Sequence, residues 1–393
     1  MTPEPFPIGP GEQLLEEFFT SGRTLDPAET PVLAQRYTSA LGLGDSRVLL
    51  ADIQQHELMP LDGGPGLPVE GSPAGWAYRT GSLRVVEDGP ELCAWFPLVD
   101  GAERLGLLEL RTSALTSQTL HRCRMLAGVL APAITSMRDS SDSYAQGTRA
   151  ERMSLPSEML RAFLPPRTIA THRVVSTAVL EPAYDLGGDA FEHALTDGAL
   201  HAAILDAMGH DLGSGLTAAL ALGACRNARR NGADLPDLVA TIDDALTRWF
   251  PDRFATGVFL RVDTGTGTLH WANCGHPPPL LIRDRKVIPD ALERPAEPPL
   301  GLTGIHHQGR TVHSASLRPG DTVLLYTDGV VEARGRNRDG FGLDRFADFI
   351  IRTTAAGEPA PEALRRLIHA LLDYQAAPLE DDCTIMMIEW RPA

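Results

Sequence analysis

The stretch LHAAILDAMGHDLGSGLTAAL, residues 200–220, joins a strand to a helix. Its first part, LHAAILDA, is an apolar run typical of a buried strand, and Asp206 stands at the end of that run. Glycines follow, and then SGLTAALALGACRNARR reads as a helix. An acid at the tip of a buried strand is costly unless it is paired or metal-bound. The stretch therefore predicts that Asp206 lies at the end of a buried strand and has a role other than packing.

Strand patterns dominate the chain from residue 172 to its end. The helix patterns there are fewer, and Leu238, Ile242 and Leu246 give one of them an amphipathic face. We expect a sheet core covered by helices on its outer faces. The other strand candidates are HRVVSTAVL (172–180), FATGVFLRVD (254–263), GTLHWANC (267–274), PPLLIR (278–283), DTVLLYT (321–327) and CTIMMIEW (383–390), and the other helices are expected over 235–250, 343–353 and 361–373.

The N-terminal part predicts a smaller α/β domain. Apolar residues repeat there at helical spacing, and two apolar runs flank a polar turn as in a hairpin. A polar, Ser-rich segment follows, and then a short helix that Pro165–Pro166 end. The expected elements are a helix over 12–42, a strand over 47–53, a hairpin around Asp100–Glu103, a helix over 116–137, a boundary at 138–152 and a short helix from Pro156 to Phe163.

Composition excludes several classes of protein. The chain has 393 residues, which suggests two domains at about 150 residues each. Its formal net charge is −16 at pH 7, which argues against binding nucleic acid or an anionic membrane through the net field. We see no signal peptide and no apolar run near the roughly 20 residues that span a bilayer. The five cysteines are scattered without a CxxC pair, so we expect a reduced, cytoplasmic protein.

Several acids of the C-terminal part stand at strand ends beside glycine. Converging carboxylates of this kind suit hard divalent cations, and their surplus negative charge needs more than one ion. The neighbouring glycines allow close backbone approach, so a carbonyl could serve as a further ligand. The alternative is that each acid caps a turn, since Asp-Gly is a common turn pair. The residues are Asp189 after Gly187–Gly188, Asp206, Asp328, Asp381 and Asp382.

The segment from about 155 to 391, more than half of the chain, resembles the PPM-type (protein phosphatase 2C-like) serine/threonine phosphatases of the SpoIIE/RsbU branch. Each matching stretch is weak alone, but together they occur in the family's order. They are EPAYDLGGDAFE (181–192), LDAMGHDLGSGLTAAL (205–220), FATGVFLRVD (254–263), ANCGHPPPLLIR (272–283), PPLGL (298–302), LRPGDTVLLYTDGVVEAR (317–334), FGLDRF (341–346) and DDCTIMMI (381–388). The resemblance implies an α-β-β-α sandwich, and hence an α+β fold for the chain.

The resemblance also implies a mechanism. Two ions, Mn²⁺ or Mg²⁺, would clamp the phosphate of a phosphoserine or phosphothreonine, and their bound water would attack in line. The absence of a GxSxG or Cys-His signature is consistent with a reaction that needs no protein nucleophile. The implied ligands are Asp206, which bridges the ions, the backbone carbonyl of Ala207, Asp328, Asp381 and Asp189, with Asp382 and Gly188 as secondary candidates; Asp206 and Asp328 would be catalytic through the bound water.

The sequence departs from the family pattern at two places. Asp211 stands where glycine usually follows the histidine, and Ala190, Phe191 and Glu192 replace the usual residues after GGD. These departures motivate an alternative, a phosphatase-like regulator that binds a signalling partner without turning it over. A third interpretation is a metal-dependent hydrolase of small phosphate esters. The intact acids favour an active protein phosphatase.

Other patterns have plainer interpretations. GGDAF resembles the GGDEF of diguanylate cyclases, but Ala190 replaces an acid that works with the metal there. TGTGTL (264–269) lacks the lysine of a P-loop and is expected to be a hairpin turn. His210 and His276 flank the proposed site and could act as general acids, although we favour a structural role that orders a loop.

The N-terminal part resembles a GAF sensory domain in its order of elements and in FPLVDGAERLGLLELR (96–111). That resemblance implies a small-molecule ligand and a homodimer that gates the phosphatase through the short helix. The predicted domains are a GAF-like sensor over 1–137, a linker with the switch helix over 138–166 and the phosphatase over 167–393. The implied substrate is a phosphoprotein, with an anti-sigma-factor antagonist as the candidate; no nucleic acid or membrane partner is expected.

Overall fold

The chain forms two compact units, Met1–Glu151 and Arg152–Ala393. The structure is a computed structural model, and it describes residues 29–138, 141–295, 297–302, 310–333, 341–374, 379 and 381–391. Of the helix expected over 12–42, residues 12–28 lie outside the described part. No helix within the described ranges is long and apolar enough to cross a membrane.

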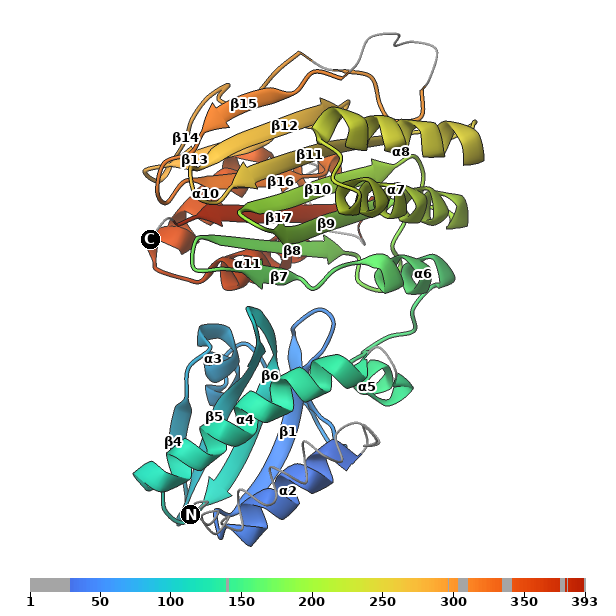
Figure 1. Cartoon of the computed structure of the whole chain (residues 1–393). Helices are drawn as coiled ribbons and strands as arrows, with labels where there is room; N and C mark the ends of the chain where they lie inside the picture. The colour runs from blue at the N-terminus through green and yellow to red at the C-terminus, as the bar shows by residue number, and fades with distance from the viewer. Residues whose placement is uncertain are drawn as a thin grey trace, which may run out of the picture. The chain divides into compact units, whose positions relative to one another are not determined.

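The first unit contains a six-stranded sheet of order β3-β2-β1-β6-β5-β4, with helices around it (Figure 1). The expected hairpin is confirmed, because Asp100 pairs with Glu103 where β5 turns into β6. The elements are α2 (Thr30–Ala40), β1 (Asp45–Ala51), β2 (Glu57–Pro60), β3 (Leu67–Pro68), α3 (Pro73–Thr80), β4 (Arg84–Asp88), β5 (Glu91–Asp100), β6 (Glu103–Thr112), α4 (Ser117–Arg138) and α5 (Asp142–Gly147).

The two faces of this sheet are covered by different helices. Val48 and Leu50 of β1 belong to the cluster with α2 and α4, whereas Leu49 belongs to the cluster with α3. This alternation is the two-residue period of a strand, so both faces are buried. Within the segment expected as a boundary, α5 buries Tyr144, whose hydroxyl lies 2.7 Å from Thr30 Oγ1. The polar segment thus packs on the first unit through one turn of helix.

The second unit is a sandwich of two antiparallel sheets. One sheet has the order β15-β12-β11-β10-β9 and the other β14-β13-β16-β17-β8-β7. The strands are β7 (Thr168–Ala170), β8 (Val174–Glu181), β9 (Asp189–Thr196), β10 (Ala199–Ala207), β11 (Ala255–Asp263), β12 (Thr268–Cys274), β13 (Leu280–Arg283), β14 (Lys286–Val287), β15 (His313–Ser316), β16 (Thr322–Tyr326) and β17 (Cys383–Trp390). The expected strands are therefore confirmed, and TGTGTL connects β11 to β12 as a turn.

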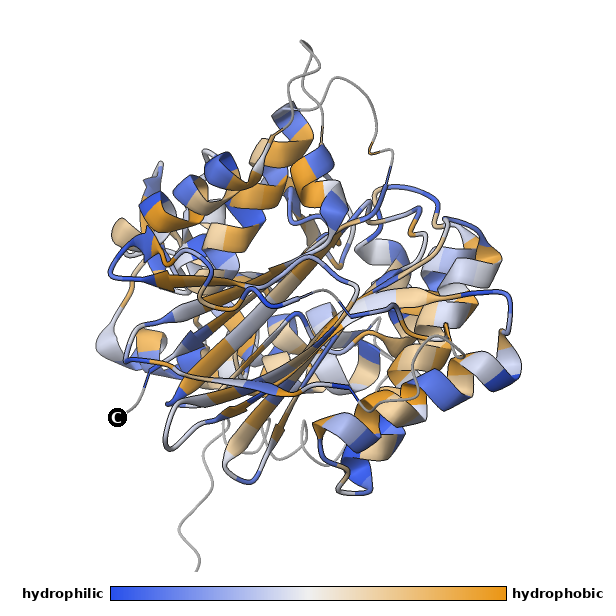
Figure 2. Ribbon diagram, turned by 90° about the horizontal axis from the view of Figure 1, so that it is seen from above, coloured by the Kyte–Doolittle hydropathy of each residue, from blue (hydrophilic) through white to orange (hydrophobic). Residues whose placement is uncertain are grey.

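Helices cover the outer faces of the sandwich, as the sequence predicts. Helices α7 and α8 pack on the sheet of β9 to β12, and α11 packs on β8 and β17. Figure 2 shows apolar residues concentrated on the strands and on the helix faces turned toward them. The helices are α6 (Leu155–Phe163), α7 (Leu212–Arg230), α8 (Leu235–Trp249), α9 (Asp328–Glu332), α10 (Leu343–Ala355) and α11 (Ala360–Tyr374).

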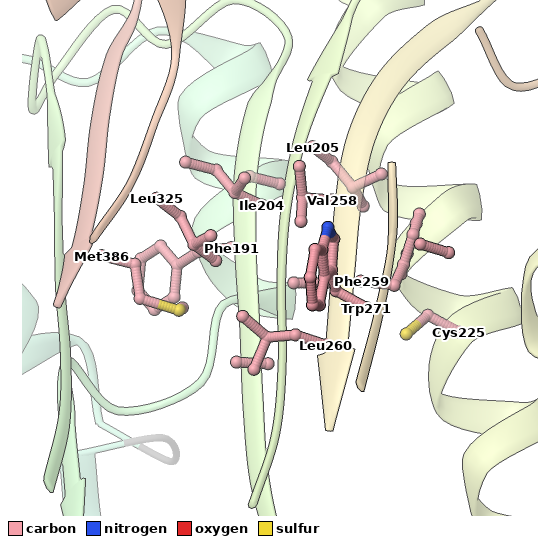
Figure 3. Close-up of a cluster of buried hydrophobic side chains, with 14 of the residues drawn as sticks. Phe191, Ile204, Leu205, Cys225, Val258, Phe259, Leu260, Trp271, Leu325 and Met386 are labelled. Atoms are coloured by element: carbon pink, nitrogen blue, oxygen red, sulfur yellow. The ribbon is translucent and has the colours of Figure 1, made fainter. Parts of the chain in front are cut away.

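The burial of strand β17 on both faces explains why CTIMMIEW is mostly apolar. Met386 and Ile388 lie in the cluster between the sheets, and Ile385 and Met387 lie in the cluster beneath α10 and α11. A strand buried on both faces reads as a continuous apolar run. Figure 3 shows Met386 and Leu325 of this sheet near Phe191 of the other.

Candidate metal centre

Asp189 begins β9 and is buried, with 2% of its surface exposed. Its Oδ2 accepts hydrogen bonds from the hydroxyls of Thr327 at 2.7 Å and Thr384 at 2.6 Å. The Thr327 hydroxyl also accepts the backbone N–H of Thr384 at 2.9 Å. One carboxylate oxygen is therefore held by β17 and the start of α9, which leaves Oδ1 for another partner.

Asp382 fixes the glycine loop before β9. Its carboxylate accepts the N–H of Gly187 at 2.7 Å and that of Asp189 at 3.0 Å. A carboxylate so occupied orients the loop, and this contact had no signal in the local sequence. Asp381, its neighbour, is exposed and accepts the N–H of Asp382 on Oδ1 at 2.9 Å.

Asp206 and Ala207 end β10, where Asp206 pairs in register with Asp189 of β9. A Cβ on Gly188 would lie 2.1 Å from the carbonyl oxygen of Ala207. Only glycine therefore permits the loop to pass so close to that carbonyl. The end of β10 therefore has the arrangement expected from the sequence, in which an acid and a backbone carbonyl lie beside a glycine.

The sequence suggested that Asp328 ends a strand, but in the structure it begins helix α9. Strand β16 ends at Tyr326, and the N–H of Thr327 bonds to the carbonyl of Thr384 at 3.0 Å before the helix starts. A Cβ on Gly329 would lie 2.1 Å from the carbonyl oxygen of Asp382. The DG pair thus brings α9 against the start of β17 and places Asp328 beside Asp381.

The carboxylates of this cluster raise one another's pKa. Burial, followed by the charges of Asp328, Asp381 and Asp382, raises the pKa of Asp206 to about 7. Burial and then the charges of Asp382 and Asp206 raise the pKa of Asp189, against the effect of the two threonine hydroxyls. The pKa of Asp328 is raised by burial and by Asp381. The cluster is therefore short of positive charge.

No basic side chain relieves this repulsion within the part of the chain that the structure describes. None of the five aspartates forms an ion pair with arginine, lysine or histidine there. Among all the residues that the structure describes, no three acidic, histidine or cysteine side chains are gathered around a single point as they are in a metal-bound site. What fits a metal is the donor chemistry, since carboxylate and carbonyl oxygens are the ligands that Mg²⁺ and Mn²⁺ prefer.

The two histidines have different surroundings. His210 is exposed in the loop before α7. His276 is buried, its Nδ1 lies 2.7 Å from Thr256 Oγ1 and its Nε2 lies 3.1 Å from the Tyr326 carbonyl oxygen. Burial lowers its pKa to about 4. With both ring nitrogens engaged in linking β11, β12 and β16, His276 fits the structural role better than that of a general acid.

Asp211, the residue that departs from the family pattern, caps helix α7. Its Oδ1 accepts the N–H of Ser214 at 2.8 Å, and its carboxylate takes both terminal nitrogens of Arg253, at 3.0 and 2.8 Å. The hydrogen bonds from Arg253, and then the one from Ser214, lower the pKa of Asp211 to about 2. Its charge is thus directed to α7 and Arg253, a pairing over 42 residues that the sequence analysis missed.

Comparison with known proteins identifies the family of the second unit. Residues 196–391 match the SpoIIE family, described as Stage II sporulation protein E. The second unit contains a SpoIIE domain. The matched segment includes Asp206, Asp328 and Asp381, whereas Asp189 precedes it.

Individual relatives resemble the SpoIIE domain over different lengths. Protein IcfG of Synechocystis sp. is 28% identical over 138 residues, which are 35% of this chain and 21% of that relative. The SiaA-PP2C domain of Pseudomonas aeruginosa is 24% identical with a TM-score of 0.52, covering 66% of this chain and 99% of that one. The RsbU and RsbW domains of a Mycobacterium tuberculosis protein are 23% identical with a TM-score of 0.47, covering 55% and 62%. The SiaA likeness shows that the SpoIIE domain has a PP2C fold.

Proposed function

We propose that the SpoIIE domain is a metal-dependent phosphatase of phosphoserine and phosphothreonine in proteins. Asp206, the Ala207 carbonyl, Asp328 and Asp381 would hold two ions, Mn²⁺ or Mg²⁺, with Asp189 binding directly or through water. The observation that carries the proposal is the convergence of these acids at one end of the sandwich, where Asp206 pairs with Asp189 and Asp382 holds the Asp189 loop. Burial and then the neighbouring acids raise the pKa values of Asp206, Asp189 and Asp328 there. Such clustering is typical of functional sites, and no residue that the structure describes supplies the compensating positive charge.

The chain's own residues prepare this site before any ligand arrives. When bound, two divalent ions supply a clamp for the phosphate and a water acidic enough to attack at neutral pH. Thr327 and Thr384 hold one oxygen of Asp189, and Asp382 holds the loop that carries it. These contacts hold a proposed ligand and its loop in place before a metal binds, as the partners of metal-binding carboxylates do.

The contacts of Asp211 weigh against the alternative of a non-catalytic regulator. That alternative rested on two departures, the added negative charge of Asp211 near the carboxylates and the altered residues after GGD, and the structure bears on the first. The Asp211 carboxylate is occupied by Arg253 and by the N-terminus of α7, and it is not among the causes of the raised pKa values. This first departure from the family pattern therefore leaves the proposed ligands undisturbed.

The test is hydrolysis of p-nitrophenyl phosphate by the full chain with Mn²⁺, with Mg²⁺ and with EDTA. We expect turnover that requires a divalent ion and is lost in Asp206→Asn and Asp328→Asn. Asp348→Asn, on the exposed side of α10, is the matched control and should keep its rate. Turnover that survives both ligand substitutions would overturn the proposal. A phosphopeptide measured beside the aryl ester separates a protein phosphatase from a hydrolase of small esters.

We also propose that the N-terminal unit regulates the SpoIIE domain through helix α6. Ser157 of α6 accepts the N–H of Leu186 on its hydroxyl at 2.5 Å, and Arg161 donates to the Ala183 carbonyl at 2.8 Å. Both contacts fall on the segment that leads to the glycine loop, so movement of α6 would alter that loop. A small-molecule ligand of a GAF-like first unit, acting in a homodimer, is the proposed input, and an anti-sigma-factor antagonist is the proposed substrate.

Loss of the contact between α6 and the glycine loop tests this route. Ser157→Ala leaves the buried N–H of Leu186 without its acceptor, which costs about 1–3 kcal/mol. We expect the apparent Mn²⁺ affinity to fall several-fold, measured by calorimetry. Ser136→Ala, an exposed serine of α4, is the control. Equal Mn²⁺ affinity in wild type and Ser157→Ala would contradict a coupling of α6 to the site.

A further inference from the structure

Arg253 is fixed at the rim of the carboxylate cluster. It lies just before β11, and the next residue, Phe254, accepts the N–H of Met208 on its carbonyl at 3.1 Å. Met208 follows the proposed Ala207 ligand directly. The arginine is therefore tied by backbone pairing to the segment that leaves the site.

The guanidinium group is held in one orientation. Asp211 binds it through two hydrogen bonds at 3.0 and 2.8 Å. It also packs against Gly213, where a Cβ would lie 2.3 Å from its Nη2 atom and 2.4 Å from Cζ. The bidentate contact with the carboxylate on one side and the glycine on the other leave the guanidinium group little freedom to rotate.

This arginine retains unused hydrogen-bond donors. A guanidinium carries five N–H groups, and the two hydrogen bonds to Asp211 use one on each terminal nitrogen. The remaining donors have no partner among the residues that the structure describes. The side chain is 26% exposed, so an external group can reach them.

Large exposed apolar side chains lie on the segment that Arg253 contacts. Met208, Leu212 and Leu216 are 42%, 41% and 36% exposed and lie on the loop and first turns of α7. Exposed apolar residues grouped beside a site mark a surface for another protein. The rim thus combines an oriented cation with an apolar surface, which is the composition of a protein-binding edge.

We propose that Arg253, oriented by Asp211, binds a carboxylate side chain next to the phosphorylated residue of the substrate. The inference rests on the proposed function. A flanking carboxylate is favoured over the phosphate itself because Arg253 lies beside the clustered aspartates and not among them: its bonds go to Asp211, and its neighbour Phe254 pairs with Met208 on the segment that leaves the site. Arg253 is thus a specificity residue for acidic phosphopeptides, and Asp211 is its positioning residue.

The test compares two phosphoserine peptides of equal length, one flanked by aspartates and one by alanines. The ratio of their kcat/KM values within one enzyme cancels any general effect on the site. We expect a ratio of about 10 in the wild type, the value of one charge-assisted hydrogen bond. Arg253→Ala should lower the ratio to about 1, Arg253→Lys should retain part of it, and Asp211→Ala should lower it by releasing the guanidinium.

Arg352→Ala is the matched control, because Arg352 also pairs with an aspartate, Asp348 at 3.1 Å, on an exposed helix. It should keep the wild-type ratio. A wild-type ratio near 1, or a ratio of about 10 that persists in Arg253→Ala, would overturn the inference. So would an equal loss of ratio in the Arg352→Ala control.

A binding measurement separates this inference from the proposed function. If neither peptide nor p-nitrophenyl phosphate is turned over, the proposed function fails, and the two peptides are then compared by fluorescence anisotropy with Mn²⁺ present. About tenfold tighter binding of the acidic peptide, lost in Arg253→Ala, supports the arginine site alone. Equal dissociation constants, or no binding of either peptide, overturn it.

Discussion

Replacing Thr384 with valine tests how the SpoIIE domain positions its most buried acid. The substitution keeps the shape of a side chain that has no exposed surface and removes only the hydroxyl that donates to Asp189 Oδ2 at 2.6 Å. A hydrogen bond to a charged group contributes about 1.5–3 kcal/mol. Thr327 still donates to the same oxygen at 2.7 Å, so we take the lower end of this range.

The expected result is an approximately tenfold weaker Mn²⁺ affinity, since about 1.4 kcal/mol corresponds to a factor of ten. The physical reason is that the hydroxyl stabilises the charged form of Asp189, whose pKa is already raised by burial and by two neighbouring acids. Without the hydroxyl, protonation competes more strongly with metal binding. Isothermal calorimetry with Mn²⁺ measures this affinity without any substrate.

Thr384→Ser is the matched control, because it keeps the hydroxyl and loses only a methyl group. Its Mn²⁺ affinity should stay closer to the wild type than that of the valine variant. Circular dichroism of both metal-free variants checks that the sandwich is intact. A folded Thr384→Val protein with wild-type Mn²⁺ affinity would refute the view that this hydroxyl positions Asp189 for a metal.

Two further predictions concern the glycine loop and a buried histidine. Gly188→Ala would place a methyl group 2.1 Å from the Ala207 carbonyl oxygen, so we expect at least a tenfold loss of Mn²⁺ affinity by calorimetry and a destabilisation of about 1–3 kcal/mol; Gly223→Ala, with open space around it, should do neither, and equal effects would contradict the argument. Burial lowers the pKa of His193 to about 4 from 6.5, so the unfolded state binds more protons between these values and stability falls as pH drops from 6.5 toward 4, by roughly 3 kcal/mol in all. Denaturant unfolding at pH 7 and pH 5 should show that the wild type loses stability relative to His193→Gln as the pH falls, a comparison in which the contribution of the acid cluster cancels, and an unchanged difference between the two proteins would exclude this role.

Periodicity in the sequence predicts most strands and helices of the SpoIIE domain. A strand such as β17, buried on both faces, has an unbroken apolar run that identifies it. In the first unit, helix α3 and strand β4 were not predicted, because α3 is short and β4 is largely exposed on a sheet edge. Whether such an element forms depends more on tertiary packing than on the local sequence pattern.

Asp189 and Asp328 stand beside glycine in the sequence, which identified them as candidate ligands, but the partners of Asp189 were not predictable. Thr327 and Thr384 lie 138 and 195 residues from the Asp189 that they contact. The only local signal was a threonine next to each acidic motif, in TDG and DDCT. Contacts across such separations come from the closing of the sandwich, which no local pattern specifies.

The carboxylate cluster also couples metal binding to the stability of the SpoIIE domain. In the metal-free protein the folded pKa values of Asp206 and Asp382 are about 7 and about 6, above the ordinary value of 3.8. The folded state then holds protons that the unfolded chain has lost, so unfolding becomes easier as pH rises from about 4 to about 7. Neutralisation of these acids by bound cations removes that loss and adds RT ln(1 + [L]/Kd), about 2.7 kcal/mol at a hundredfold excess over Kd. The residues that weaken the metal-free fold are thus the ones through which a divalent cation would strengthen it.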